Sequence, residues 1–404
     1  MDRKLVIILL DACRGDYISQ ETTPFLFKLK DNNRYFKNLV PGYGFCERTE
    51  IFVGKSPLES GYFTAFGRCP EESPYKNLRI PLIILGKIEE LFSSPFLSKV
   101  IRRFIWEVVK NKKGTFYPFR IPLNKLSEFR LTEDGPRNLI DSSDESLYQI
   151  ARKVYKDATT SLNTKLSGSD QDRLDLVLKG IDKPYDFYPT YISSLDYIGH
   201  QNGPISSEIK KELSRLDSTL EDFYTKLQDY EDPPTVVFCG DHGMSPIKNI
   251  VNIQLVIDKL ILENHLLTGF NMFLDSTMAR FWFDEKVSSD MSMLKNALEN
   301  NFKDKGFFLL RADYQNFGIP DSDLYGDCIW ICQDGILISP DFFSPINKVI
   351  KGMHGYQPLA SQHYGFAIIA GKDFKKEHFD KPMPLTSVYS DMKNYLLGLN
   401  TIMK

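Results

Sequence analysis

The sequence predicts an α/β fold: a doubly wound, mostly parallel sheet with helices on both faces and two inserted cap segments. Short apolar, β-branched runs alternate along the chain with amphipathic helical stretches, which is the pattern of βαβ units. Several of these runs end abruptly at aspartate or histidine, as expected at the carboxyl ends of buried parallel strands. The chain has 404 residues, more than the roughly 250–300 at which a single core stops growing, so insertions into the core are expected.

The core is expected to consist of three pieces of chain, because the strong strand patterns lapse twice. The first lapse contains proline-rich turns and a basic amphipathic segment, and the second mixes a helix with alternating strands. The predicted division is core at 1–68, an inserted helical cap at 69–183, core at 184–248, an inserted α+β lobe at 249–351, and core at 352–404.

The first strand is predicted at Leu5–Leu10, six apolar residues that end at Asp11. With the preceding Met1-Asp-Arg-Lys this run imitates the start of a signal peptide, but it is short and has no small-residue cleavage site. The elements expected next are a helix from Thr23 to about Asp31, a strand near Tyr35–Val40 and, after the Pro41–Gly44 turn, a short helix over Cys46–Val53 that Gly54 stops.

The first insertion contains a basic amphipathic segment, Leu97–Lys113, and a polar helix near Ser146–Ser161. Two interpretations of residues 97–113 remain open: a cap helix with its apolar side on the core, or an interfacial helix that docks on anionic lipid. The second interpretation would give the protein a peripheral membrane contact and would suit a substrate that carries a lipid-linked phosphate.

The remaining core is predicted from a strand over Asp186–Leu195, a long helix and a strand over Thr235–Cys239. The helix is identified by apolar residues at alternating steps of four and three, namely Ile209, Leu213, Leu216, Leu220, Phe223 and Leu227. The second insertion should contain strands over Met278–Phe283 and Cys328–Ile338 and a helix over Ser289–Phe302, and the core should close with a strand over Gly365–Ala370 and a helix near Ser387–Leu397.

Composition narrows the class of protein. The formal net charge of −3 argues against a dedicated nucleic-acid binder, so no nucleic-acid duplex is expected as a partner. The six cysteines show neither a disulfide framework nor paired zinc-site spacing, which suits a reducing cytoplasm. No stretch is long and apolar enough to span a bilayer, and a soluble, cytoplasmic protein is expected.

Six potential metal ligands follow the predicted strands or open the last core segment: Asp11, Asp196, His200, Asp241, His242 and His354. Their anionic oxygens and imidazole nitrogens are ligands that both zinc and manganese accept. The spacing of Asp196 and His200 places both side chains on one helical turn or tight loop, so they can share an ion. Two divalent ions side by side could clamp the attacking and departing oxygens of an in-line displacement at phosphorus.

Four motifs contain these ligands: Leu9-Leu10-Asp11 followed by Arg14, Asp196-Tyr-Ile-Gly-His200-Gln-Asn-Gly-Pro204, Gly240-Asp241-His242-Gly-Met244, and His354-Gly-Tyr356. In this order they resemble the alkaline phosphatase superfamily, particularly its type I phosphodiesterase/nucleotide pyrophosphatase branch. The resemblance implies that one ion is bound by Asp196, His200 and His354, and a second ion by Asp11, Asp241 and His242. Zinc is what this resemblance implies, and the ligand types leave manganese open.

The sequence departs from the family pattern at the nucleophile. The family places a Thr, Ser or modified Cys ten residues before the glycine of a Thr-Gly pair; here that pair is Val53-Gly54 and the position is Gly44. Cys46 is the nearest candidate and would lie at a helix N-terminus, where the dipole favours a thiolate. Thr49 is the alternative, with the commoner hydroxyl chemistry. Direct attack by an activated water, or no catalysis, also remains open.

Two arginines could contact a substrate phosphate, since a guanidinium matches the geometry of phosphate oxygens. These are Arg14 and Arg48, and a surface or structural role for each is an equally open alternative.

The expected function is that of a divalent-metal-dependent phosphoesterase, most simply a phosphodiesterase acting on a nucleotide, sugar-phosphate or lipid-linked phosphodiester. Within the superfamily, a phosphotransferase or phosphomutase remains an alternative, and so does a sulfatase, although the sulfatase-type CxPxR signature is absent at Cys46-Glu-Arg-Thr-Glu50. From a different class, the chain could be a metal-binding scaffold that has lost catalysis. Retention of all six ligands argues against that, because buried carboxylates without a cation are costly.

Overall fold

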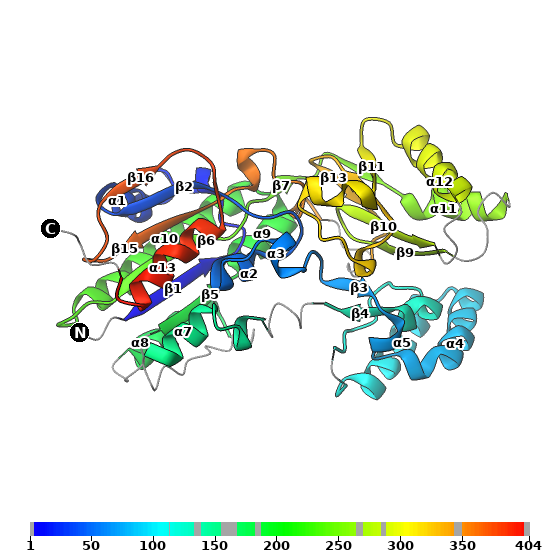
Figure 1. Ribbon diagram of the computed structural model, residues 1–404, viewed down its shortest axis with the longest axis horizontal. Helices are drawn as coiled ribbons and strands as arrows, with labels where there is room; N and C mark the ends of the chain where they lie inside the picture. The colour runs from blue at the N-terminus through cyan, green and yellow to red at the C-terminus, as the bar shows by residue number, and fades with distance from the viewer. Residues whose placement is uncertain are drawn as a thin grey trace. The chain divides into compact units, whose positions relative to one another are not determined.

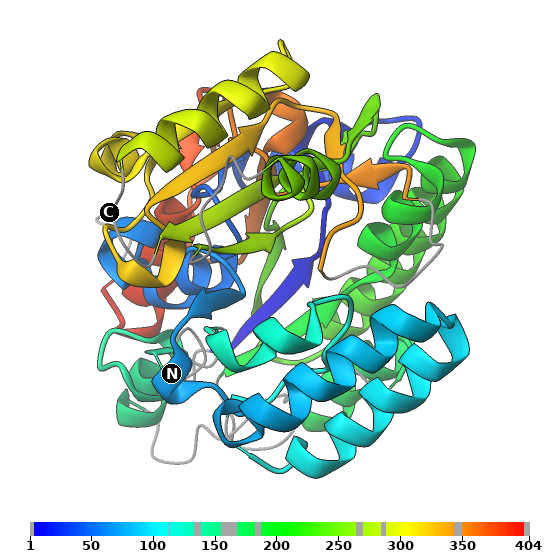
Figure 2. The same cartoon turned by 90° about the vertical axis from the view of Figure 1, so that its right-hand side faces the viewer.

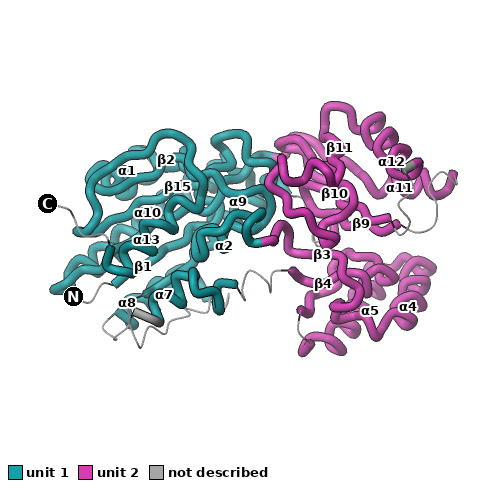
Figure 3. Tube along the Cα trace, viewed as in Figure 1, with its two compact units in different colours: residues 1–60, 136–246, 350–404 teal, residues 61–135, 247–349 magenta. Residues whose placement is uncertain are grey.

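The computed structural model describes residues 4–112, 114–132, 139–154, 168–181, 187–263, 270–283, 288–342 and 350–399. The chain forms two compact units (Figure 3). Unit 1 contains residues 1–60, 136–246 and 350–404, and unit 2 contains residues 61–135 and 247–349.

Unit 1 is built around a seven-stranded sheet of order β16-β2-β15-β6-β1-β5, with β17 pairing beside β2 (Figure 1). Strand β15 is antiparallel to both of its neighbours, and every other pair in the sheet is parallel, so the predicted mostly parallel sheet is confirmed. The strands are β1 (Leu5–Leu10), β2 (Arg34–Val40), β5 (Phe187–Ile192), β6 (Thr235–Gly240), β15 (Gly365–Ala370), β16 (Glu377–Phe379) and β17 (Met383–Pro384).

Helices cover both faces of this sheet, as predicted for a doubly wound fold. They are α1 (Pro24–Asn32), α2 (Glu47–Val53), α3 (Pro57–Ser60), α7 (Leu147–Val154), α8 (Asp170–Gly180), α9 (Ser194–Asn202), α10 (Ser207–Gln228) and α13 (Thr386–Leu396). Successive residues of a strand point to opposite faces. The odd-numbered residues of β1 accordingly pack in one core with α2, α7 and α13, and the even-numbered residues in another with α1, α8 and α10. All six apolar residues predicted to form the buried face of α10 lie in this second core.

Unit 2 contains a four-stranded antiparallel sheet of order β11-β12-β10-β9 and two helical pairs. Its strands are β3 (Phe66–Arg68), β4 (Phe129–Leu131), β8 (Asn249–Val251), β9 (Phe270–Leu274), β10 (Met278–Phe283), β11 (Gly306–Leu310), β12 (Cys328–Cys332) and β13 (Ile336–Ile338). Its helices are α4 (Arg79–Phe92), α5 (Pro95–Val109), α11 (Ile253–Leu262) and α12 (Ser288–Asn301). Among the described residues, no helix combines the length and the apolar character that crossing a bilayer requires.

The predicted division of the chain needs correction. The stretches 61–135 and 247–349 cluster as one unit, whereas separate insertions at 69–183 and 249–351 were expected. Helices α7 and α8, whose residues were assigned to the first insertion, belong to unit 1, where they pack against the central sheet. The boundary at residue 183 lies outside the described residues, as do residues 155–161 of the predicted Ser146–Ser161 helix.

Two predicted strands end earlier than expected. The strand expected over Asp186–Leu195 ends at Ile192, because residues 194–202 form helix α9. The strand expected over Cys328–Ile338 is divided into β12 and β13, which belong to different sheets, with a turn at Gly335 (φ +80°) between them. The alternating apolar pattern crosses this turn, which is why sequence alone did not reveal it.

Candidate metal centre

Neighbouring strands place the acidic residues at one edge of the central sheet. β1 pairs in parallel with β6 on one side and β5 on the other, and Leu10 lies opposite Gly240. Asp11 and Asp241 therefore follow their strands at the same level. The chain that leaves β5 enters α9, which holds Asp196. Because parallel strands end at a common edge, three motifs that are distant in sequence converge here.

Asp11, Asp241 and His242, here called the buried trio, each offer a ligand atom, and these atoms lie within 4.8 Å of one another. Nε2 of His242 is 3.1 Å from Oδ1 of Asp11 and 3.8 Å from Oδ1 of Asp241. Oδ1 of Asp241 also accepts hydrogen bonds from the backbone N–H groups of Ala12 and His242, at 3.2 and 2.9 Å. These bonds hold the Asp241 carboxylate in position.

Asp196, His200 and His354, here called the half-buried trio, form a second such group within 4.8 Å. Nε2 of His200 and Nε2 of His354 lie 3.2 and 3.5 Å from Oδ1 of Asp196. Helix α9 places Asp196 and His200 one turn apart, and the short antiparallel ladder of β14 (Gly352–Met353) with β7 (Ser245–Pro246) positions His354. The rings of His242 and His354 stack with centroids 4.2 Å apart, so the two trios are adjacent.

Gly243 allows two backbone segments to meet beside the buried trio. Its N–H donates a hydrogen bond to the carbonyl oxygen of His363 at 2.9 Å. A Cβ at this position would lie 1.9 Å from the carbonyl oxygen of Gln362, closer than any side chain permits. The glycine of the Asp-His-Gly motif is therefore required by backbone packing.

The hydrogen bonds of two imidazoles fit metal binding through Nε2. Nδ1 of His200 lies 2.8 Å from the carbonyl oxygen of Gly352, and Nδ1 of His242 lies 2.9 Å from the carbonyl oxygen of Gly243. A carbonyl can only accept, so each Nδ1 carries a proton, and Nε2 is the nitrogen that can bind a metal once it is deprotonated. Three carboxylates and three imidazoles in this arrangement fit two divalent ions.

Burial makes the buried trio retain protons when no cation is present. Desolvation and the nearby charge of Asp241 raise the pKa of Asp11 to about 7. Desolvation also raises the pKa of Asp241. Burial alone would lower the pKa of His242, but the charge of Asp241 and the hydrogen bond to Asp11 outweigh it and raise that pKa well above its ordinary value. A divalent cation would replace these protons.

The half-buried trio differs in its charge state. Burial opposes ionisation of Asp196, but the hydrogen bond with His200 and the charge of His354 hold its pKa below the ordinary value. Burial and the charge of His242 hold the pKa of His354 well below its ordinary value. At neutral pH, Asp196 is therefore an anion and His354 a neutral imidazole, the forms that bind a metal.

Metal binding at the buried trio should weaken as the pH falls below about 7. Asp11, with a pKa of about 7, and His242, with a raised pKa, hold protons there, and a metal requires the deprotonated forms. We expect the increase in melting temperature caused by added manganese or zinc to be larger at about pH 8 than at about pH 6, in thermal unfolding of chelator-treated protein. Asp11→Asn cannot titrate and should show a smaller dependence on pH. Equal metal-induced shifts at both pH values in the parent would contradict the expectation.

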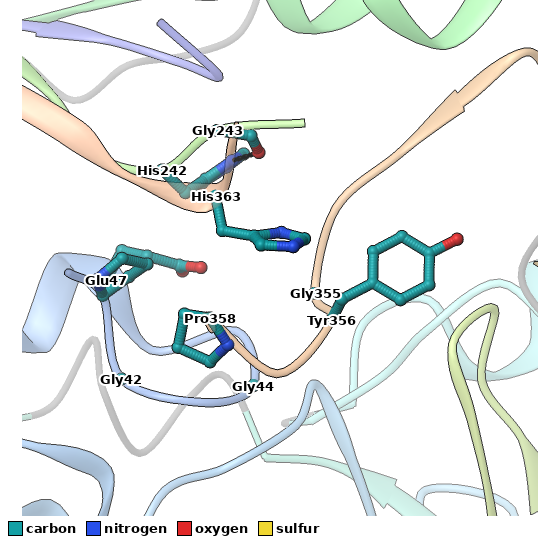
Figure 4. Close-up of a pocket in the computed structure, with 10 residues that line it drawn as sticks. Gly42, Gly44, Glu47, His242, Gly243, Gly355, Tyr356, Pro358 and His363 are labelled. Atoms are coloured by element: carbon teal, nitrogen blue, oxygen red, sulfur yellow. Dashed lines mark hydrogen bonds between the residues drawn. The ribbon is translucent and has the colours of Figure 1, made fainter. Parts of the chain in front are cut away.

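A pocket of about 240 Å³, its open mouth included, adjoins the buried trio (Figure 4). Figure 4 shows the carboxyl group of Glu47 and the ring of His363 directed into the same space. Gly44 also lines it, with φ +112°, a conformation that L side chains rarely adopt. The pocket is lined by Pro41, Gly42, Gly44, Glu47, His242, Gly243, Gly355, Tyr356, Pro358 and His363.

The two predicted nucleophiles lie on the first turn of α2. Cys46 is the N-cap residue, as predicted, and is 5% exposed. Thr49 is fully buried, and its hydroxyl has no hydrogen-bond partner among the described residues. Of the four consecutive, described residues from Cys46 to Thr49, Glu47 is the one that lines the pocket. The assignment of the nucleophile to Cys46 or Thr49 stays a prediction.

Glu47 is a half-buried residue that lines the pocket beside the buried trio. Burial raises its pKa to about 7; the charge of His242 opposes this rise and that of Asp241 adds to it. A carboxyl group with this pKa can hold or release a proton at neutral pH.

Arg14 is held by neighbouring protein groups. Its Nε donates to Oδ1 of Asp16 at 2.8 Å, and its Nη1 donates to the carbonyl oxygen of Met244 at 3.2 Å. These contacts fit the structural role that the sequence left open for Arg14, and its contact with a phosphate stays a prediction.

Arg48 is connected to the buried trio indirectly, by way of a tyrosine side chain. Its guanidinium is 4.9 Å from the ring centroid of Tyr191, and the hydroxyl of Tyr191 donates a hydrogen bond to Asp11. Contact of Arg48 with a substrate phosphate remains a prediction.

Sequence reasoning missed three side chains at the site: Glu47, Tyr191 and His363. Tyr191 lies opposite Leu9 in the β1–β5 ladder, so the register of two recognised strands was the signal that could have found it. His363 precedes the predicted strand over Gly365–Ala370, and the structure places it, buried, in the wall of the pocket. Glu47 had no signal beyond its position between two nucleophile candidates.

A family model for type I phosphodiesterase/nucleotide pyrophosphatase matches residues 113–357, more than half of the chain. The chain belongs to this family. The matched region contains five of the six predicted ligands, all except Asp11. The resemblance inferred from the four motifs is thereby confirmed.

This type I phosphodiesterase family member is similar to several curated proteins. It is 35% identical over 252 residues to the human GPI ethanolamine phosphate transferase 2 catalytic subunit, covering 60% of this chain and 21% of the relative. It is 22% identical over 414 residues to an uncharacterised pyrophosphatase/phosphodiesterase of Schizosaccharomyces pombe. That match covers 97% of this chain and 76% of the relative. The chain thus spans about a fifth of the length of the human relative.

Among solved structures, murine ectonucleotide pyrophosphatase/phosphodiesterase 5 matches with a TM-score of 0.67 and 14% sequence identity. The match covers 98% of this chain and 95% of that chain. At this identity the match shows a common fold, and the mixed α/β architecture agrees with the one predicted.

Proposed function

We propose that this type I phosphodiesterase family member is a divalent-metal-dependent phosphodiesterase that acts on a nucleotide, sugar-phosphate or lipid-linked phosphodiester. The observation that supports it most strongly is the adjacency of the two ligand trios, with the rings of His242 and His354 stacked 4.2 Å apart. Two-ion sites of this composition are suited to displacement at phosphorus.

The chain's own residues would hold and orient the metal site. When bound, two divalent ions would neutralise phosphate charge and support the attacking and departing oxygens. The buried trio would bind one and the half-buried trio the other, with zinc as the proposed metal and manganese as the alternative. The hydroxyl of Tyr191 orients the Asp11 carboxylate, and the carbonyl groups of Gly243 and Gly352 set the orientation of His242 and His200.

The relatives support two of the proposed substrate classes, a lipid-linked phosphate and a nucleotide. The human relative's name identifies it as a GPI ethanolamine phosphate transferase, which favours a lipid-linked phosphate. The murine structural neighbour was solved in complex with AMP, which favours a nucleotide. A cytoplasmic location is part of the same proposal; all six cysteines lie in described residues, and none of them forms a disulfide.

A phosphotransferase is the second candidate, favoured by the 35% identity to a transferase over 252 residues. A transferase would pass the substituted phosphoryl group of the diester to an acceptor alcohol, where a hydrolase would pass it to water. Reacting the protein with bis-nitrophenyl phosphate in the presence of glycerol separates the two: a glycerol ester as the main product would indicate transfer, and nitrophenyl phosphate would indicate hydrolysis.

The proposal is tested with bis-nitrophenyl phosphate, nitrophenyl phosphate and nitrophenyl sulfate, each with and without a chelator. We expect the diester to be hydrolysed fastest and the chelator to abolish turnover. Preference for the sulfate would favour the sulfatase alternative. A metal-loaded protein with no turnover of any of the three would favour the lapsed scaffold.

Glu47→Gln should lower diester hydrolysis by about 10- to 100-fold, because the variant keeps the shape of the pocket but removes its titratable carboxyl group. Glu59→Gln is the matched control, since Glu59 is exposed and its carboxylate binds Ser56; it should retain full activity. Unchanged hydrolysis by Glu47→Gln would remove this residue from the proposal.

Cys46→Ala and Thr49→Ala, assayed beside Glu47→Gln, test the nucleophile. Loss of diester hydrolysis in only one of these two variants would identify the attacking residue. Full hydrolysis in both variants would favour direct attack by water.

A further inference from the structure

Unit 2 contains a helical hairpin, formed by α4 and α5, whose outer side is apolar. The two helices lie side by side and are joined by Ser93-Ser94 (Figure 2). Nine large apolar side chains of the hairpin, here called the apolar face, are exposed: Ile80, Ile83, Ile84, Leu91, Phe92, Phe96, Val100, Phe104 and Val108.

On α5 the apolar face is a continuous stripe. Phe96, Val100, Phe104 and Val108 recur every four residues, so they lie along one side of the helix. Phe96 is 77% exposed and Phe104 is 66% exposed. Side chains with this spacing normally cover a core, and exposed apolar surface of this extent marks an interaction site.

The inner side of the hairpin is already stabilised without the apolar face. The guanidinium of Arg102 donates from Nε and Nη2 to the two carboxylate oxygens of Glu89, at 2.9 and 2.8 Å. Its Nη1 donates at 2.6, 2.7 and 2.9 Å to the carbonyl oxygens of Pro118, Phe119 and Ile121. The inner side also buries Leu82, Ile101, Ile105 and Val109. The hairpin is therefore packed without its apolar face, which stays exposed on the outer side.

The charge of the hairpin favours one kind of partner. Residues 79–112 contain seven Lys and Arg and three Glu, whereas the whole chain has a net charge of −3. Lys87, Lys99 and Arg103 are exposed among or beside the apolar residues. If two copies of the chain docked hairpin to hairpin, their like charges would be brought together. A bilayer with anionic headgroups offers both an apolar layer and the opposite charge.

We propose that the apolar face of the α4–α5 hairpin docks on an anionic lipid membrane surface. Its Ile, Leu and Phe side chains enter the boundary between headgroups and acyl chains, and its Lys and Arg side chains contact lipid phosphates. Helix α5 has 15 residues and a length of about 22 Å, so it lies along the interface. This docking extends the interfacial interpretation of residues 97–113 to both helices, and it is independent of the proposed catalytic function.

Co-sedimentation with vesicles tests the docking. We expect the full chain to sediment with phosphatidylcholine vesicles that contain phosphatidylserine, and much less with phosphatidylcholine alone. Phe96→Ser combined with Phe104→Ser should weaken binding by at least about tenfold. Leu255→Ser combined with Leu262→Ser is the matched control, because these residues are 65% and 82% exposed on α11. It should bind as the parent does.

The charge contribution is tested by Lys87→Glu combined with Lys99→Glu, which should abolish the preference for phosphatidylserine. The Phe double variant and the Lys double variant both change exposed side chains, and thermal unfolding of each verifies that it folds. No sedimentation of the parent with phosphatidylserine vesicles, or unchanged binding of the Phe double variant, would overturn the proposal. Self-association without lipid that the Phe variant abolishes would identify a second copy as the partner and would also overturn it.

Hydrolysis of bis-nitrophenyl phosphate separates this proposal from the catalytic one. The Phe double variant should hydrolyse this soluble substrate at the rate of the parent. A parent that binds vesicles but hydrolyses nothing would count against the proposed function and leave the docking intact.

Discussion

Asp241→Ala should reduce hydrolysis of bis-nitrophenyl phosphate by at least about 100-fold and lower the metal content of the purified protein. The change removes one of the three ligand groups of the buried trio and leaves the backbone N–H groups of Ala12 and His242 without their acceptor. Replacing residues that merely orient metal ligands already costs about 10- to 100-fold in metal affinity or activity, so the loss of a ligand should cost more. Elemental analysis and steady-state rates measure the two effects.

Asp232→Ala is the matched control for this change. Asp232 is exposed on unit 1, and its carboxylate forms a surface ion pair with Lys372. The control should keep the metal content and the rate of the parent. Normal metal content and normal hydrolysis in Asp241→Ala would refute the assignment of the buried trio.

Asp275→Ala should destabilise unit 2 by about 3–5 kcal/mol, the range observed when one partner of a buried ion pair is removed. Asp275 and Arg280 are both fully buried, and Nε of Arg280 lies 2.7 Å from Oδ2 of Asp275. Arg280 also donates to the carbonyl oxygen of Phe66, and its guanidinium lies 4.9 Å from the ring centroid of Phe273. Without Asp275 the buried guanidinium loses the carboxylate with which it pairs.

Urea unfolding followed by tryptophan fluorescence measures this effect selectively. The three tryptophans of the chain, Trp106, Trp282 and Trp330, all belong to unit 2. Asp321→Ala is the control: it breaks the more exposed pair with Arg311 (2.6 Å) and should change the free energy of unfolding by less than about 1 kcal/mol.

Replacing both partners, as Asp275→Leu with Arg280→Met, should recover much of the stability lost in Asp275→Ala, because no uncompensated charge is then buried. An Asp275→Ala protein as stable as the parent would show that the ion pair contributes little.

The cluster of six potential ligands was predictable because its signals are local. A buried strand must end where polar residues begin, so Asp11 and Asp241 could be placed at the edge of a parallel sheet from sequence alone. The turn of helix between Asp196 and His200 was likewise implied by their spacing. The structure brings all six predicted ligands together in two adjacent trios.

The neighbourhood of the nucleophile could not be predicted in the same way. Which of four consecutive residues faces the pocket depends on the turn that precedes α2, where Gly44 has φ +112° and Phe45 packs at 5.6 Å against the ring of His354. That contact joins residues more than 300 positions apart, and it places Glu47 in the wall of the pocket. Cys46 and Thr49 are candidates for the nucleophile only because their side chains have suitable chemistry.

Local patterns were therefore enough to predict a doubly wound sheet, the buried face of α10 and the six residues that converge at the edge of the sheet. Periodicity and the polar residues at strand ends are properties of neighbouring residues. They did not reveal that 61–135 and 247–349 form one unit, or that the α4–α5 hairpin buries a charged pair and exposes its apolar stripe. Those features depend on which distant segments pack together, and packing free energy is a property of the assembled molecule.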